Sequence, residues 1–166
     1  MILKLSLDLP EDQEYIHTTR LLSRTLLDDL RVVAQDKDDI ETIVTELCTN
    51  VVRHAKSTEG RYHLVIEYYR EKAVITVEDQ GIGFTLETMV AAGTERPESL
   101  AGGVRIGGFG VPLVKALSDR IRFDLASPKG TKVRAEKALH YETAQARARA
   151  ASMDETCGAK IEVDDE

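Results

Sequence analysis

The chain has 166 residues, of which 42% are hydrophobic, and a formal net charge of -7. This length can bury a globular core without metal or disulfide staples, and the acidic balance argues against nucleic acid as a direct partner, because phosphate binding needs a basic face. Cys48 and Cys157 have no companion at metal-ligand spacing, so we expect neither a zinc site nor a disulfide framework. The apolar runs are shorter than the about 20 residues of a membrane helix, so we expect a cytoplasmic protein without membrane contact.

The first half of the chain alternates between strand-like and helix-like patterns. Leucine recurs at every second position of residues 2–9, which predicts a strand. Apolar residues recur at helical spacing in 11–33 and 36–55, so we expect two helices that pack together. Residues 62–70 and 73–78 are rich in β-formers and are joined by a short charged turn, which indicates an antiparallel hairpin.

The second half contains a long stretch without periodicity. In residues 93–108 glycine, proline, serine and charges accumulate, which suggests a functional lid. The other expected elements are a short helix at 86–92, a helix at 111–117, strands at 120–126 and 131–136, and a helix at 138–151. Helices and hairpin strands thus form separate groups, which predicts an α+β two-layer sandwich whose mixed, mostly antiparallel sheet is covered on one face by helices.

Three side chains of the second helix share one strip. Glu46, Asn50 and His54 follow one another at steps of four residues, and each step rotates by only about 40° around a helix. A carboxylate in this position can accept a proton from a nucleophile, and an amide oxygen suits a hard cation such as Mg²⁺. The alternative is an ordinary solvated helix face.

The sequence EDQGIGF begins at the last residue of the strand expected at 73–78. Asp79 at a strand end can accept a hydrogen bond from an exocyclic amine such as that of adenine, and Gly81 and Gly83 let the backbone approach a flat ring. A tight turn with a solvated aspartate is the alternative.

A second glycine-rich segment, RIGGFGVPLVK at 105–115, opens a helix. Pro112 stands in the first turn, where its missing N–H costs little. Backbone N–H groups at such a helix start can bind phosphate oxygens. A lid without a ligand is the alternative.

Four motifs in this order resemble the GHKL ATPase superfamily of gyrase, Hsp90, histidine kinases and MutL, and within it the anti-sigma factor serine/threonine kinases. They are ELCTNVVRH at 46–54, DQGIGF at 79–84, GFGV at 108–111 and Gly-Thr at 130–131. Each is weak alone, and together they are specific. The resemblance implies the Bergerat ATPase fold, with residues 1–137 as the histidine kinase-like ATPase domain and 138–166 as a C-terminal helical and acidic extension.

The resemblance also implies roles for individual residues around ATP and Mg²⁺. Glu46 would be the catalytic base, Asn50 would hold Mg²⁺, Asp79 would bind adenine N6, and Thr131 would support the adenine site. Arg105 resembles a γ-phosphate contact, with a solvated lid arginine as the alternative. The remaining cofactor-binding candidates are His54, Gly81, Gly83, Gly107, Gly108, Phe109, Gly110 and Val111.

The function implied by the resemblance is transfer of phosphate from ATP to a serine or threonine of a small anti-sigma factor antagonist, together with sequestration of a sigma factor or another client. The chain could also pair with a second copy of itself. One alternative is a nucleotide-gated binding module without catalysis. Another is the catalytic domain of a sensor histidine kinase, which would need a phosphoacceptor helix upstream; the HTTR sequence at His17 lacks the context of that motif.

Overall fold

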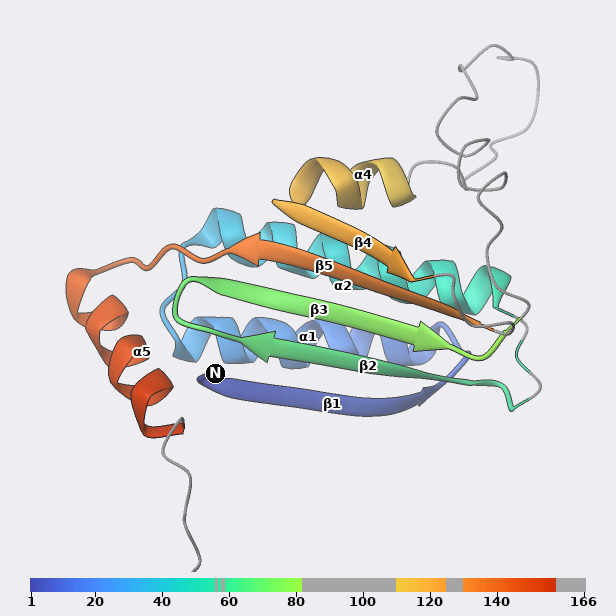
Figure 1. Cartoon of the computed structure of the whole chain (residues 1–166), viewed down its shortest axis with the longest axis horizontal. Coiled ribbons are helices and arrows are strands. Elements are labelled where there is room, and N and C mark those ends of the chain that lie inside the picture. The colour runs from blue at the N-terminus through green and yellow to red at the C-terminus, as the bar shows by residue number, and fades with distance from the viewer. Residues whose placement is uncertain (56, 58, 82–109, 125–129, 158–166) are drawn as a thin grey trace, which may run out of the picture.

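The structure is a computed structural model that describes residues 1–55, 57, 59–81, 110–124 and 130–157. Figure 1 shows one sheet with helices behind it and a further helix at one end. The strands, in order across the sheet, are β1 (Leu3–Pro10), β2 (Arg61–Tyr68), β3 (Lys72–Asp79), β5 (Thr131–Ala138) and β4 (Arg120–Asp124). Every pairing between them is antiparallel, so the described sheet is wholly antiparallel rather than mixed. The predicted α+β two-layer fold is confirmed.

The described helices are α1 (Glu14–Asp29), α2 (Ala34–His54), α4 (Gly110–Leu117) and α5 (Ala144–Cys157). Both α1 and α4 contact α2, and these three helices cover the same face of the sheet. The helix α5 stands at the end of the sheet where β2 turns into β3 (Figure 1). Among the described residues, none of the helices has the length and apolar character needed to cross a bilayer.

The core lies between the sheet and α2. Side chains alternate between two faces along a strand, and in β2 every second residue is buried. The residues that meet in this layer include Leu64, Ile66, Ile75, Val77, Ile40, Ile43, Val44 and Leu47. Fully burying one such aliphatic side chain contributes about 1.5–3 kcal/mol, so this layer fixes α2 firmly over the central strands.

The first helix is shorter than the predicted range of 11–33. It ends at Asp29, and Arg31 adopts a left-handed conformation with φ of 57°. The Val32 N–H then donates to the Leu27 carbonyl oxygen at 3.1 Å, so the chain turns directly into α2. Apolar periodicity continues through this corner because the residues around it stay buried, and so it does not reveal the end of the helix.

The last helix begins later than the predicted residue 138. β5 continues to Ala138, and the next residues form a connection that is bonded to the α1–α2 corner. The Val33 N–H donates to the His140 carbonyl oxygen at 2.9 Å, and Leu139 is buried. The Thr143 hydroxyl oxygen accepts the Ala146 N–H at 3.0 Å and so caps α5. These contacts keep residues 139–143 out of the helix, whereas the alanine-rich residues that follow form the first turns of α5, as their propensity favours.

The predicted hairpin is confirmed as β2 and β3, with Tyr68 opposite Ala73. Asp79 is the last residue of β3 and belongs to the sheet itself. The short helix expected at 86–92 and the lid expected at 93–108 lie outside the described residues.

Candidate functional site

The strip predicted on α2 lies at the edge of its buried face. Glu46 and Asn50 are half-buried, and His54, the last residue of the helix, is exposed. The buried side chains of Leu47 and Val51 hold this end of α2 against the sheet. The strip is therefore only partly a solvated helix face.

Gly110, the first residue of α4, lies directly against the strip. A methyl group built on its Cα would come within 2.8 Å of Glu46 Oε2 and 3.1 Å of Asn50 Oδ1. A side chain on this residue would therefore fill the space in front of both polar groups. The start of the helix that follows the glycine-rich segment thus meets the carboxylate and the amide of a helix about sixty residues earlier in the sequence.

Asp79 and Thr131 form the polar end of the sheet on the helix-covered side. They are register partners on β3 and β5, and both are buried. The Asp79 carboxylate accepts the Gly81 N–H at 2.8 Å and is hydrogen-bonded by the backbone and the side chain of Thr131. Burial raises the pKa of Asp79, whereas the Gly81 and Thr131 hydrogen bonds act in the opposite direction.

Two glycines allow the backbone to close tightly around Asp79. A side chain on Gly81 would overlap the carbonyl oxygen of Ala55, the residue that follows α2. Gly130 has a φ of 100°, and a side chain there would overlap the Asp79 carbonyl oxygen. The end of α2, the end of β3 and the start of β5 consequently converge at one place.

Glu11 is a neighbour of this site that the sequence does not indicate. Its charge contributes to the raised pKa of Asp79. The Glu11 carboxylate also accepts hydrogen bonds from the Ser57 hydroxyl and the Ser57 N–H. These bonds connect the segment between β1 and α1 to the segment after α2. No sequence motif links Glu11 to Asp79. The two residues come close because the end of β1 pairs with the start of β2, which in turn pairs with the end of β3.

Six of the predicted site residues form two clusters in the structure. The structure brings Glu46, Asn50 and Gly110 together, and it joins Asp79, Gly81 and Thr131 around one carboxylate. These groups lie at the same end of the molecule, where α2 and β3 end and where α4 and β5 begin (Figure 1). Val111 is half-buried in the first turn of α4. The other candidates, Gly83, Arg105, Gly107, Gly108 and Phe109, lie outside the described residues.

Among the described residues, the groups nearest to Gly110 that could bind a cation are oxygen ligands. Glu46 and Asn50 offer a carboxylate and an amide oxygen, and the described residues contain no group of three or more His, Cys, Asp or Glu that could hold a metal by themselves. This set fits Mg²⁺, which is usually held by one or two protein oxygens together with substrate phosphates.

The fold and these sequence motifs are those of an ATPase domain. The chain belongs to the histidine kinase-like ATPase family, whose domain matches residues 9–137. The predicted membership of the GHKL superfamily is confirmed, and this membership implies ATP binding.

Similar proteins include several that are named serine-protein kinase RsbW. The one from Listeria monocytogenes serotype 4a (strain HCC23) is 31% identical over 122 residues, which cover 72% of this chain and 78% of the relative. The one from Bacillus licheniformis is 27% identical over 136 residues, which cover 80% and 84% respectively.

The fold is also similar to a crystal structure of RsbU and RsbW domains from Mycobacterium tuberculosis. The TM-score is 0.59 at 16% sequence identity, over 85% of this chain and 35% of that chain. At this identity the likeness concerns the fold alone. The chain corresponds to about a third of that longer protein.

Proposed function

We propose that this chain is an ATP-dependent serine/threonine protein kinase that phosphorylates a small anti-sigma factor antagonist and sequesters a sigma factor or another client. The observation that carries the proposal is the position of Gly110 against Glu46 and Asn50. The names of the relatives support the reaction. The nature of the two partners follows from the family resemblance.

The nucleotide would bind at the end of the molecule where these residues converge. Asp79 would accept a hydrogen bond from the adenine amino group, and Thr131 would hold that carboxylate in place. Backbone N–H groups at the start of α4 would bind phosphate oxygens beside Asn50. His54, Gly83, Arg105, Gly107, Gly108 and Phe109 remain candidates for further nucleotide contacts.

Glu46 would orient the acceptor hydroxyl and take its proton. As the hydroxyl oxygen forms a bond to the γ-phosphorus, the bond between that phosphorus and the bridging oxygen breaks, and ADP leaves with the bonding electrons. Mg²⁺, held by Asn50, would neutralise the phosphate charges. Such reactions depend mainly on positioning and electrostatics, which a half-buried carboxylate beside a helix start supplies.

Release of the product would follow from charge. Phosphorylation adds about -1.5 to -2 charges to the acceptor protein. The chain carries a net charge of -7, so the phosphorylated partner would be repelled more strongly than the unmodified one.

The test is the substitution Glu46→Gln, assayed with labelled ATP and candidate antagonist proteins. We expect phosphotransfer to be abolished while ADP affinity, measured by calorimetry, stays close to that of the parent. Glu41→Gln is the matched control, because Glu41 lies on the same helix but is paired with Arg20 and Arg24. An unchanged phosphotransfer rate in the Glu46 variant would exclude the base role. Nucleotide binding without any phosphotransfer by the parent would instead support the binding-module alternative.

A further inference from the structure

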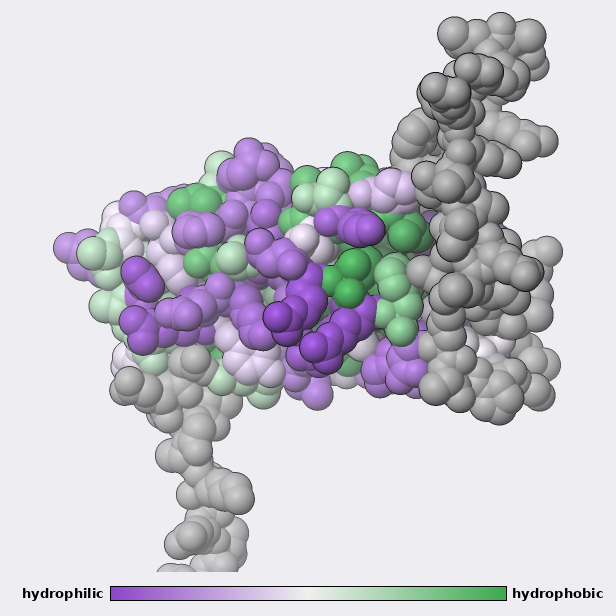
Figure 2. Space-filling model, turned by 45° about the horizontal axis from the view of Figure 1, so that its top comes forward, coloured by the Kyte–Doolittle hydropathy of each residue, from purple (hydrophilic) through white to green (hydrophobic). Residues whose placement is uncertain are grey.

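One face of the sheet carries no described helix. Ile121, Val133 and Ala135 pack into the core beneath the helices, so the alternate residues of β4 and β5 project from the opposite face. Figure 2 shows hydrophilic side chains gathered across this side of the molecule. On β4 and β5 this open face carries four cations and two carboxylates: Arg120, Arg122, Lys132, Arg134, Asp124 and Glu136.

Most charged residues of the open face stand opposite a complementary charge. Asp8 lies opposite His63 at 2.8 Å, and Glu78 lies opposite Lys132 at 3.0 Å. Lys4 lies opposite Glu67, and Arg120 opposite Glu136. Such pairing is the usual arrangement, because opposite charges across neighbouring strands stabilise a sheet.

Arg122 and Arg134 break this pattern. They are direct register partners on β4 and β5, so their side chains leave the same face side by side. Thr76 stands opposite Arg134 on the other side, which makes a row of one hydroxyl and two guanidinium groups across three strands. Two strand spacings span about 10 Å, so the row is narrow.

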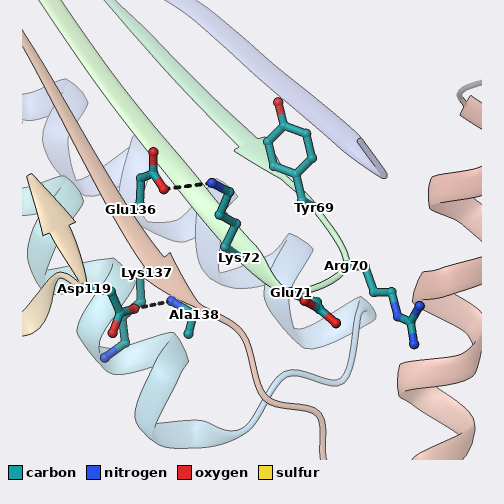
Figure 3. Close-up of a pocket in the computed structure, with 8 residues that line it drawn as sticks. All are labelled: Tyr69, Arg70, Glu71, Lys72, Asp119, Glu136, Lys137 and Ala138. Atoms are coloured by element: carbon teal, nitrogen blue, oxygen red, sulfur yellow. Dashed lines mark hydrogen bonds and ion pairs between the residues drawn. The ribbon is translucent and has the colours of Figure 1, made fainter.

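The nearby carboxylate of Glu136 is already engaged. Lys72 donates to it at 2.7 Å, beside the cavity drawn in Figure 3, and this contact lowers the pKa of Glu136. Arg134 reaches the other oxygen of Glu136 only at 3.5 Å, and Arg122 makes no ion pair with any described residue. Arg122 is exposed, and the side chain of Arg134 is 42% exposed, so both guanidinium groups are accessible to a ligand.

We infer that Arg122 and Arg134 form a docking site for a carboxylate-bearing surface of a partner protein. Each guanidinium group presents planar pairs of donors, which match the geometry of a carboxylate, and the register places the two arginines side by side. The rungs on either side, about 7 Å away along the strands, carry Asp124 and Glu136. A continuous phosphate backbone laid across these strands would meet both carboxylates, whereas a single acidic side chain fits between them.

The net charge of the whole chain indicates that an acidic partner would be attracted only to this part of the surface. The whole chain has a net charge of -7, whereas β4 and β5 present more cations than carboxylates on the open face. The positive charge is therefore confined to a small part of the surface. The partner is therefore expected to present a small acidic patch, and its binding should weaken as salt rises. The site lies on the side of the sheet opposite to α2, so we expect substitutions there to leave nucleotide binding unchanged.

The test uses the full chain and a hexaglutamate peptide as the probe, with calorimetry or NMR of the arginine side-chain N–H groups at low salt. We expect saturable binding that weakens by about fivefold or more in Arg122→Gln and in Arg134→Gln. Arg120→Gln is the matched control, because Arg120 lies on the same strand and face but opposite Glu136. Its affinity should stay within about twofold of the parent.

Two further readouts separate a docking site from a structural role. Without peptide, Arg122→Gln should melt at the same or a higher temperature than the parent, because it removes a like-charge contact. Its ADP affinity should not change. An absence of saturable peptide binding, or an equal loss in Arg120→Gln, would overturn the inference. Tighter binding of inorganic phosphate or a short oligonucleotide through the same arginines would overturn the choice of an acidic protein.

Discussion

Asp79 and Thr131 face each other across the β3–β5 pair, and Thr131 hydrogen-bonds the Asp79 carboxylate through both its backbone and its side chain. This contact holds a buried carboxylate at the end of the sheet. We expect Asp79→Asn to weaken ADP binding by about 10- to 100-fold, because a charge-assisted hydrogen bond contributes about 1.5–3 kcal/mol. Calorimetry measures the loss. Asp124→Asn, at the end of β4 on the open face, is the control, and equal losses in both variants would argue against an adenine contact at Asp79.

The raised pKa of Asp79 predicts how nucleotide binding depends on pH. The folded state holds this proton more tightly than the unfolded chain, so Asp79 contributes stability at low pH that is lost as pH rises through its folded pKa. The ionised carboxylate is the form that would accept the adenine amine. ADP affinity should therefore begin to fall, on acidification, at a higher pH than for an ordinary aspartate.

Glu11 provides the test of this pH dependence. Glu11→Gln removes a negative neighbour but keeps an oxygen that can accept the Ser57 hydrogen bonds. We expect the pH midpoint of ADP binding to move downward, as measured by calorimetry across a pH series. Glu14→Gln, in the first turn of α1, should leave the midpoint in place. An unmoved midpoint in the Glu11 variant would mean that Glu11 does not act on the binding carboxylate.

Gly110→Ala should separate stability from catalysis. Alanine is about 0.5–1 kcal/mol better than glycine within a helix, but its methyl group would push against Glu46 Oε2 at 2.8 Å. The Glu46 side chain can rotate away, so the protein should remain folded with an unchanged or higher melting temperature. We expect phosphotransfer to fall by about tenfold or more while ADP affinity falls less. Lys115→Ala, exposed on the same helix, should change neither, and a parallel loss there would point to a general effect on α4.

The boundary between the ATPase domain and the extension can be tested by truncation. The connection after β5 is bonded to the α1–α2 corner, and the His140 N–H donates to the buried Asp36 carboxylate at 2.6 Å. We expect a chain that ends at residue 143 to be clearly more stable to urea than one that ends at 137, by about 2 kcal/mol or more, because the shorter chain leaves the Asp36 acceptor and the Val33 N–H without these partners. Equal stability of the two truncated chains would support the boundary at 137.

The fold class followed from local patterns. Alternation along β2 and β3 and the helical stripe of α2 report burial directly, because a strand repeats every two residues and a helix every 3.6. Boundaries were less accessible. Arg31 ends a helix through a left-handed backbone angle, and the contacts of Leu139 and His140 delay the start of α5 to Ala144. Neither effect leaves a mark in apolar periodicity.

The residue pattern alone identifies the candidates, since Glu46 and Asn50 share one strip on any helix with that spacing. Which of them come into contact depends on the packing of the helices and the sheet. Gly110 reaches that strip, and Glu11 reaches the surroundings of Asp79, through strand pairing and helix packing between segments distant in the chain. The order of the motifs implies a shared site for Asn50 and Gly110 only through a family resemblance, because the local periodicity of the chain does not encode how the layers pack.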